Sequence, residues 1–144
     1  MQNNKQTTFA MRFSKINVLR YSQNDVEDFN PNKGPLVEFQ TSFQLRISED
    51  TNEIGILATV KMVIIKTKEL FAELRLECFF EIKPLEQVII KEDIDIKVPK
   101  DLLRNLTSIV IGTIRGVLHE KLKGTQLQNE VYPLVSAEDL INLG

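Results

Sequence analysis

The sequence predicts a single α+β domain with a four-stranded antiparallel sheet and one long helix packed on one face of that sheet. Three stretches alternate apolar and polar residues and are joined by short polar turns, which is the pattern of an antiparallel meander. A later segment repeats apolar residues at helical spacing. The 144 residues have the length of one domain, so we expect a single unit over 1–144, with residues 1–8 disordered.

A first strand is expected near the start of the chain, from Phe9 to about Val18. Apolar residues alternate as far as Phe13 and then resume one position late at Ile16. A slip of one residue in a pattern of period two predicts a β-bulge, here near Ser14. The alternation does not reveal where this strand lies within the sheet.

The meander is expected over residues 37–48, 54–66 and 70–83. Residues 37–48 alternate strictly, which predicts a strand with one buried face. The other two stretches each present one continuous apolar face. The core should therefore form on this shared face.

The long helix is expected over residues 99–123, after a connector at 84–98. Pro99 suits a first helical position, and Gly124 suits the end of the helix. Apolar residues recur along it at Leu103, Leu106, Val110, Ile114 and Val117.

The C-terminal tail predicts a short extended piece around Pro133, followed by a short helical turn. Ser136 and Asp139 have the spacing of residues that open such a turn.

Composition excludes several classes of protein. The net charge of −2 gives no electrostatic footprint for nucleic acid. Cys78 is the only cysteine, so no intramolecular disulfide can form and a reducing compartment is expected. The polar N-terminus does not resemble a signal peptide, and no apolar run approaches the roughly 18 residues of a membrane span. We therefore expect a cytoplasmic protein.

Side chains that could carry out catalysis are few and scattered. Cys78 falls on the apolar face of its strand, and His119 lies late in the helix without a marked serine partner. The glycines do not form a phosphate-binding loop, and the acidic residues at 92–95 lack calcium-loop spacing. The sequence therefore predicts a binding protein that is not an enzyme, with no cofactor and no metal.

Gly112 and Gly116 are unusual because both fall within the expected helix. Each glycine costs a helix about 0.8–1 kcal/mol relative to alanine. A compensating close approach is expected, either to the sheet or to a helix of another protomer.

The face of the meander opposite the core is also unusually apolar. Five apolar residues on this face could form a contiguous patch of the size that marks an interaction site, and Glu73 lies among them. We therefore expect a client- or partner-binding surface formed by Leu57, Val63, Ile65, Phe71, Glu73 and Phe79.

The order of these elements resembles the SecB export chaperone family over roughly residues 9–140. The segments that carry the resemblance are 70–82, 99–103, the glycine-containing helix segment 109–116, and 131–136 (Val-Tyr-Pro-Leu-Val-Ser). The resemblance is to divergent, non-proteobacterial members. Phe71 and Glu73 match an apolar and an acidic position of that family's docking face.

The resemblance implies a SecB-like fold and an ATP-independent chaperone. Such a protein holds unfolded or precursor polypeptides for export and hands them to the translocase ATPase. Its protomers pair through strands and helices, and two dimers form a homotetramer. The alternative is a dedicated relative, such as a toxin–antitoxin-associated chaperone, which binds one partner and does not contact the translocase.

Overall fold

The computed structural model describes residues 10–26, 37–133 and Ala137. The expected disorder of residues 1–8 and the helical turn opened by Ser136 lie outside these described residues.

The described residues form a four-stranded antiparallel sheet with the order β1-β4-β3-β2. Its strands are β1 (Ala10–Gln23), β2 (Val37–Ser48), β3 (Glu53–Ile64) and β4 (Leu70–Lys83). The expected meander is confirmed, and β1 adds to it at the free side of β4. Both β1 and β2 are therefore edge strands, which the alternation alone could not establish.

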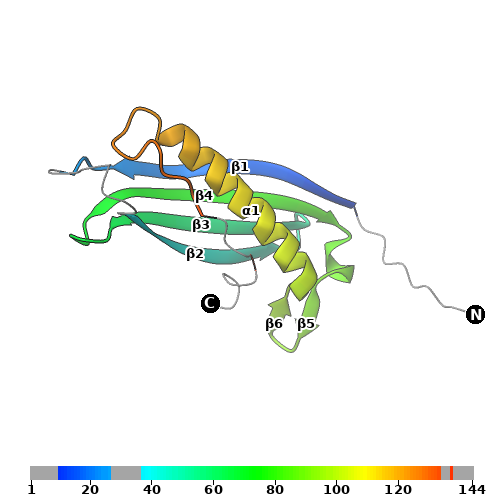
Figure 1. The fold of residues 1–144 in the computed structure, drawn as a ribbon. Coiled ribbons are helices and arrows are strands. Elements are labelled where there is room, and N and C mark those ends of the chain that lie inside the picture. Colours follow the sequence, from blue (N-terminus) through cyan, green and yellow to red (C-terminus); the bar gives the residue numbers. More distant parts are fainter. Residues whose placement is uncertain (1–9, 27–36, 134–136, 138–144) are drawn as a thin grey trace, which may run out of the picture.

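One helix, α1 (Lys100–Lys121), crosses a single face of the sheet diagonally (Figure 1). Its C-terminal end lies over β1, and its N-terminal end lies near β2 at the opposite end of the sheet. The helix begins one residue later than expected, because Pro99 has an extended backbone and precedes the first turn. Gly124 has a left-handed φ of 77°, as expected of a glycine at a helix end.

The connector between β4 and α1 contains more structure than the sequence indicated. A short 3-10 helix, η1 (Leu85–Gln87), leads into a small hairpin of β5 (Ile90–Glu92) and β6 (Asp95–Lys97). This hairpin projects from the main sheet (Figure 1).

The core lies between α1 and the sheet, on the face that the alternation predicted. The helix contributes Leu106, Val110, Ile114 and Leu118, each at most 1% exposed. The sheet contributes mainly the alternate residues of β3 and β4, from Ile54 to Met62 and from Ala72 to Ile82. Burial at about 25 cal/mol per Å² of apolar surface makes this layer the main source of stability.

Candidate functional site

The candidate surface predicted on the open face of the sheet is corrected at two of its residues. Phe71 is fully buried and belongs to the core, and Val63 is only 8% exposed. The cause is a register shift in which Met62 pairs with Ala72 but Val63 pairs with Leu70. Phe71 is therefore an extra residue in β4, and the bulge breaks the alternation that would have directed its side chain to the open face.

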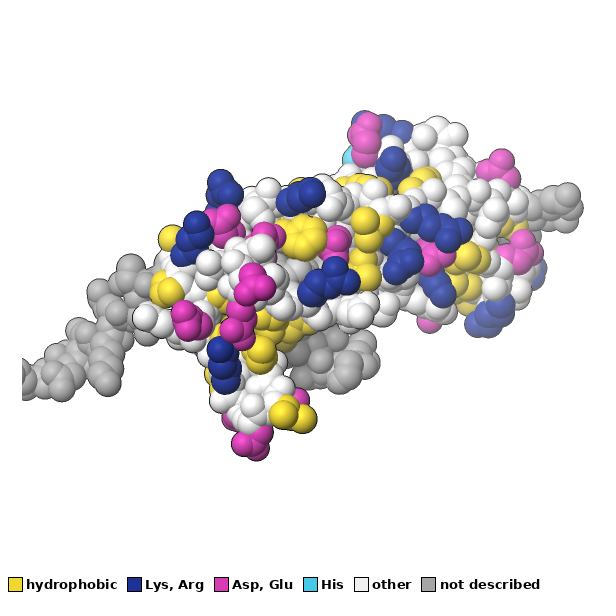
Figure 2. All heavy atoms as spheres, turned by 180° about the vertical axis from the view of Figure 1, so that it is seen from behind, with side chains coloured by type: hydrophobic (Ala, Val, Ile, Leu, Met, Phe, Trp, Pro, Cys, Tyr) yellow, Lys and Arg dark blue, Asp and Glu magenta, His cyan; other side chains and the backbone are white. Residues whose placement is uncertain are grey.

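The other members of that surface do not join into one apolar patch. Leu57, Glu73 and Phe79 are half-buried, and Ile65 is exposed just beyond the end of β3. The ring of Phe79 lies against Gly55, where an added Cβ would approach it to 3.1 Å. Charged side chains separate the apolar ones across this face (Figure 2). The open face is thus mixed in character.

A more continuous apolar surface lies on the other face, along β1. Met11, Phe13, Ile16 and Val18 pair directly with the buried residues Ile82, Phe80, Cys78 and Leu76 of β4. Directly paired residues point to the same face of a sheet, so all four β1 residues lie on the helix side. They are nevertheless between 37% and 49% exposed. We call these four residues the β1 strip.

Two bulges keep the β1 strip in phase. The register shifts between Phe13 and Lys15, which confirms the bulge expected near Ser14, and again between Val18 and Arg20. The Ser14 hydroxyl donates a hydrogen bond of 3.1 Å to the carbonyl of Phe79 and so fixes the first bulge. Each extra residue resets the alternation, so the apolar residues on both sides of it face the helix side.

The β1 strip is exposed because α1 crosses the sheet diagonally. The helix reaches β1 only near its C-terminal end, where the Lys121 ammonium lies 5.7 Å from the centre of the Tyr21 ring. Toward the start of β1 the helix runs away from this strand and toward the β2 edge, on the same face of the sheet (Figure 1). This corner of the helix side is therefore left uncovered by α1.

The diagonally opposite corner, over β2, is closed by the C-terminal tail. The Tyr132 ring packs edge-on against Phe39 with centroids 5.5 Å apart, and its hydroxyl lies 2.6 Å from that of Thr41. The Arg115 guanidinium donates hydrogen bonds of 3.2 Å to the carbonyls of both Tyr132 and Pro133. Burial raises the pKa of Tyr132 above its usual value. The tail thus covers the first half of β2, around Phe39 and Thr41, whereas α1 leaves the β1 strip open.

The two helix glycines do not pack against the sheet, which corrects one of the two close approaches expected. Gly112 and Gly116 are exposed, and a Cβ added at either would meet no atom within 4 Å. They lie on the outer side of α1, where no side chain or strand of the described residues approaches them.

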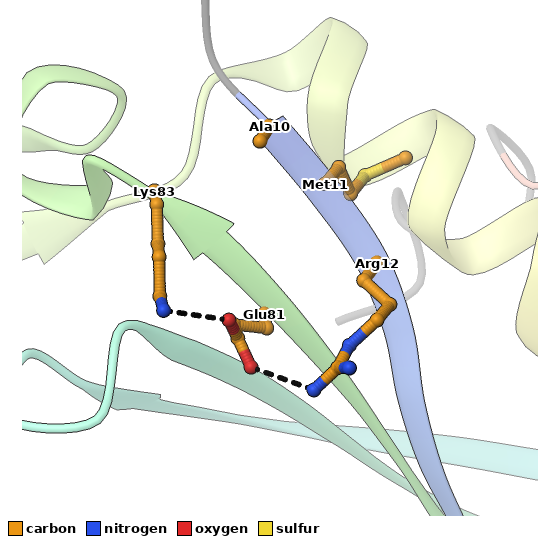
Figure 3. Close-up of a pocket in the computed structure, with 5 residues that line it drawn as sticks. All are labelled: Ala10, Met11, Arg12, Glu81 and Lys83. Carbon is orange, nitrogen blue, oxygen red and sulfur yellow. Dashed lines mark hydrogen bonds and ion pairs between the residues drawn. The ribbon is translucent and has the colours of Figure 1, made fainter.

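A shallow pocket of about 240 Å³ lies at the start of β1, between Ala10, Met11, Arg12, Glu81 and Lys83 (Figure 3). The Glu81 carboxylate accepts contacts of 3.0 Å from both Lys83 and Arg12. The hydrogen bond from Lys83, together with the charges of Lys83 and Arg12, lowers the pKa of Glu81. One carboxylate thus faces two cations.

Cys78 and His119, the two side chains considered for catalysis, lie in different environments. Burial raises the pKa of Cys78 to about 11, so the thiol stays protonated, and His119 is exposed near the end of α1. No group of acidic, histidine or cysteine side chains in the described ranges could hold a metal ion. No helix in the same ranges is both long and apolar enough to cross a membrane.

Comparison with solved structures supports the fold. The chain superposes on the Mycobacterium tuberculosis SecB-like chaperone Rv1957, solved in complex with a ChAD peptide from the Rv1956 HigA1 antitoxin. The TM-score is 0.61 over 88% of this chain and 90% of that chain, at 10% identity. The fold is SecB-like. The SecB-like resemblance of the sequence is thereby supported, and the similarity at this identity concerns the fold.

A second solved structure is a protein of unknown function from Streptococcus agalactiae. It is 17% identical, with a TM-score of 0.44 over 90% of this chain and 98% of that chain. No family model and no curated protein matches the sequence.

Proposed function

We propose that this SecB-like protein is an ATP-independent cytoplasmic chaperone that holds non-native polypeptides. The observation that carries the proposal is the β1 strip, a row of half-exposed apolar side chains on an edge strand. Such a row on a soluble surface is typical of an interaction site. The Rv1957 chaperone, which has the same fold, is bound to a peptide in its structure, which supports a polypeptide ligand here.

The strip and the strand edge together suit an extended chain. On its outer side β1 is not paired with any strand of the described residues, so its backbone groups can accept a further strand. A client strand placed there would direct alternate side chains toward Met11, Phe13, Ile16 and Val18. Hydrogen bonds to the backbone do not depend on client sequence, which suits a protein that holds many different chains.

Self-association is proposed through the outer side of α1. Gly112 and Gly116 are one helical turn apart and leave space for a close neighbour. A helix from a second copy fits this space, giving a dimer or, with a second pairing, a homotetramer. The cost of two helix glycines would then be offset by contact between protomers.

The second candidate is a dedicated chaperone for one partner. The antitoxin peptide on Rv1957 favours it, since that structure contains a peptide of a single protein. Docking to the translocase ATPase would need the open face. Phe71 is buried in the core, so only Glu73 of the two family-matched residues reaches that face. Purification of the protein from its host distinguishes the two, because one dominant partner indicates the dedicated role and a broad pool of precursors indicates the general one.

The proposed function is tested by following the aggregation of an unfolded client at stoichiometric ratios. The wild-type protein should suppress aggregation, and a combined Ile16→Ser and Val18→Ser variant should lose most of this effect. Leu45→Ser is a matched control, because Leu45 is 40% exposed on the same face of the opposite edge strand. The proposal fails if the wild-type protein has no effect, or if the control loses as much as the β1 variant.

A further inference from the structure

On the open face of the sheet, β1 has a charge pattern that the proposed function does not use. Arg12, Lys15 and Arg20 pair with Glu81, Phe79 and Arg75 of β4, so all three cations lie on the open face. β1 contains no acidic residue. The strand is therefore apolar on the helix side of the sheet and cationic on the open face.

Two of these three cations make no ion pair with β4, although Glu77 lies opposite Asn17 on the same face. Arg12 shares the Glu81 carboxylate with Lys83. Arg20 lies directly opposite another cation, Arg75, an arrangement that destabilises a sheet. Within the described residues neither Lys15 nor Arg20 takes part in an ion pair. Cations without an ion-pair partner at a strand edge attract an anionic neighbour.

We propose that the β1 edge selects extended polypeptide segments in which apolar residues alternate with acidic ones. This inference rests on the proposed function and specifies the chemistry of its ligand. In such a segment, alternate side chains lie about 6–7 Å apart on one side. The apolar set would lie beside the β1 strip while the acidic set faces Lys15 and Arg20. The bulges at Ser14 and Leu19 limit regular pairing to short runs, so a short segment fits best.

Charge complementarity favours an acidic segment over a second copy at this edge. Two β1 strands placed side by side would bring together cations with no acidic partner in any register. Lysine and bulges on an edge strand can also protect it from unwanted pairing, in which case the edge binds nothing. A peptide-binding experiment distinguishes an edge that binds acidic segments from an edge that binds nothing.

The test uses the full chain and three labelled peptides that alternate isoleucine with glutamate, glutamine or lysine. Binding is measured by fluorescence anisotropy at low and high salt. The glutamate peptide should bind about tenfold more tightly than the lysine peptide, since each exposed ion pair contributes modestly. The difference should shrink at high salt. The chain has a net charge of −2, so such a preference would arise from the local arrangement on β1.

Charge reversal supplies the matched control. Lys15→Glu combined with Arg20→Glu should transfer the preference to the lysine peptide. Arg46→Glu should leave it unchanged, because Arg46 lies on the same open face but on the opposite edge strand. Equal binding of all three peptides would overturn the inference and leave the proposed function standing. Failure of every peptide to bind would overturn both.

Discussion

The Phe13 ring stacks on the Phe80 ring with their centroids 4.8 Å apart and their planes 27° from parallel. Phe80 is fully buried in the core, whereas Phe13 is 37% exposed on the edge strand. The pair therefore joins the core to the β1 strip. One side of the Phe13 ring contributes to stability, and the exposed part is available to a ligand.

The stacked pair predicts a measurable contribution to stability. Phe13→Ala should lower the free energy of unfolding by about 1–3 kcal/mol, because stacking and part of the apolar burial are lost. Met11→Ala, at a more exposed position of the same strip, should cost less. Urea denaturation of the two variants measures the difference. Equal losses in the free energy of unfolding would mean that the Phe13–Phe80 contact adds no stability beyond that of an ordinary residue of the β1 strip.

The closed corner over β2 predicts coupling between Tyr132 and Thr41. Tyr132→Phe removes one member of the hydroxyl pair and should cost about 1 kcal/mol. Adding Thr41→Val to this variant should cost less than Thr41→Val alone, because the interaction is already lost. A double-mutant cycle by urea denaturation measures this coupling, and strictly additive costs would contradict the contact.

Burial of Cys78 predicts low reactivity and a specific dependence on pH. Desolvation raises the pKa of this thiol from 9.0 to about 11, although a hydrogen bond with Thr113 opposes the shift. Alkylation by iodoacetamide at pH 8 should be at least tenfold slower in the folded protein than in urea, since the thiolate is the nucleophile.

The raised pKa of Cys78 also fixes the sign of its effect on stability. The unfolded thiol loses its proton at lower pH than the folded one, so this contribution is complete below about pH 9 and is lost as the pH rises toward about 11. Tyr21 and Tyr132 also have raised pKa values, so their contributions fall in the same direction. The comparison of wild type with Cys78→Ala isolates the cysteine. An identical alkaline loss of stability in both proteins would refute this assignment.

The outer glycines of α1 predict opposite effects of alanine and leucine. Gly112→Ala should stabilise the helix by up to about 1 kcal/mol, because the space around it is open among the described residues. Leucine at both Gly112 and Gly116 should prevent close approach of a second helix and lower the mass in solution. Light scattering measures this mass. The alanine variant is the control, because its small side chain should still allow a second helix to approach. An unchanged mass with leucine would place self-association elsewhere.

The meander and the helix were predictable because their patterns are long and locally consistent. The strict alternation over β2 reflects one half-buried face, and the helical spacing of α1 reflects one buried face. The bulge at Ser14 was also readable, since the apolar phase slips within the sequence. A second slip at Leu19 is marked by the spacing from Val18 to Tyr21, which offers the same kind of signal.

The binding surface was less predictable because it depends on tertiary arrangement. The position of β1 at the edge and the diagonal path of α1 together expose the β1 strip, and neither is encoded in a local pattern. Phe71 was misplaced because the sequence pattern of β4 shows no slip at this residue, and the bulge is seen only in the pairing of β4 with β3. The small β5–β6 hairpin was missed since its strands are short and exposed.

The most direct test of the account is methyl NMR during titration with an unfolded client. The resonances of Ile16 and Val18 should shift or broaden as the client binds. Those of Leu45, on the opposite edge of the same face, should change little. Binding of the client with changes at Leu45 and none at Ile16 or Val18 would contradict the claim that the β1 strip is the polypeptide-binding surface.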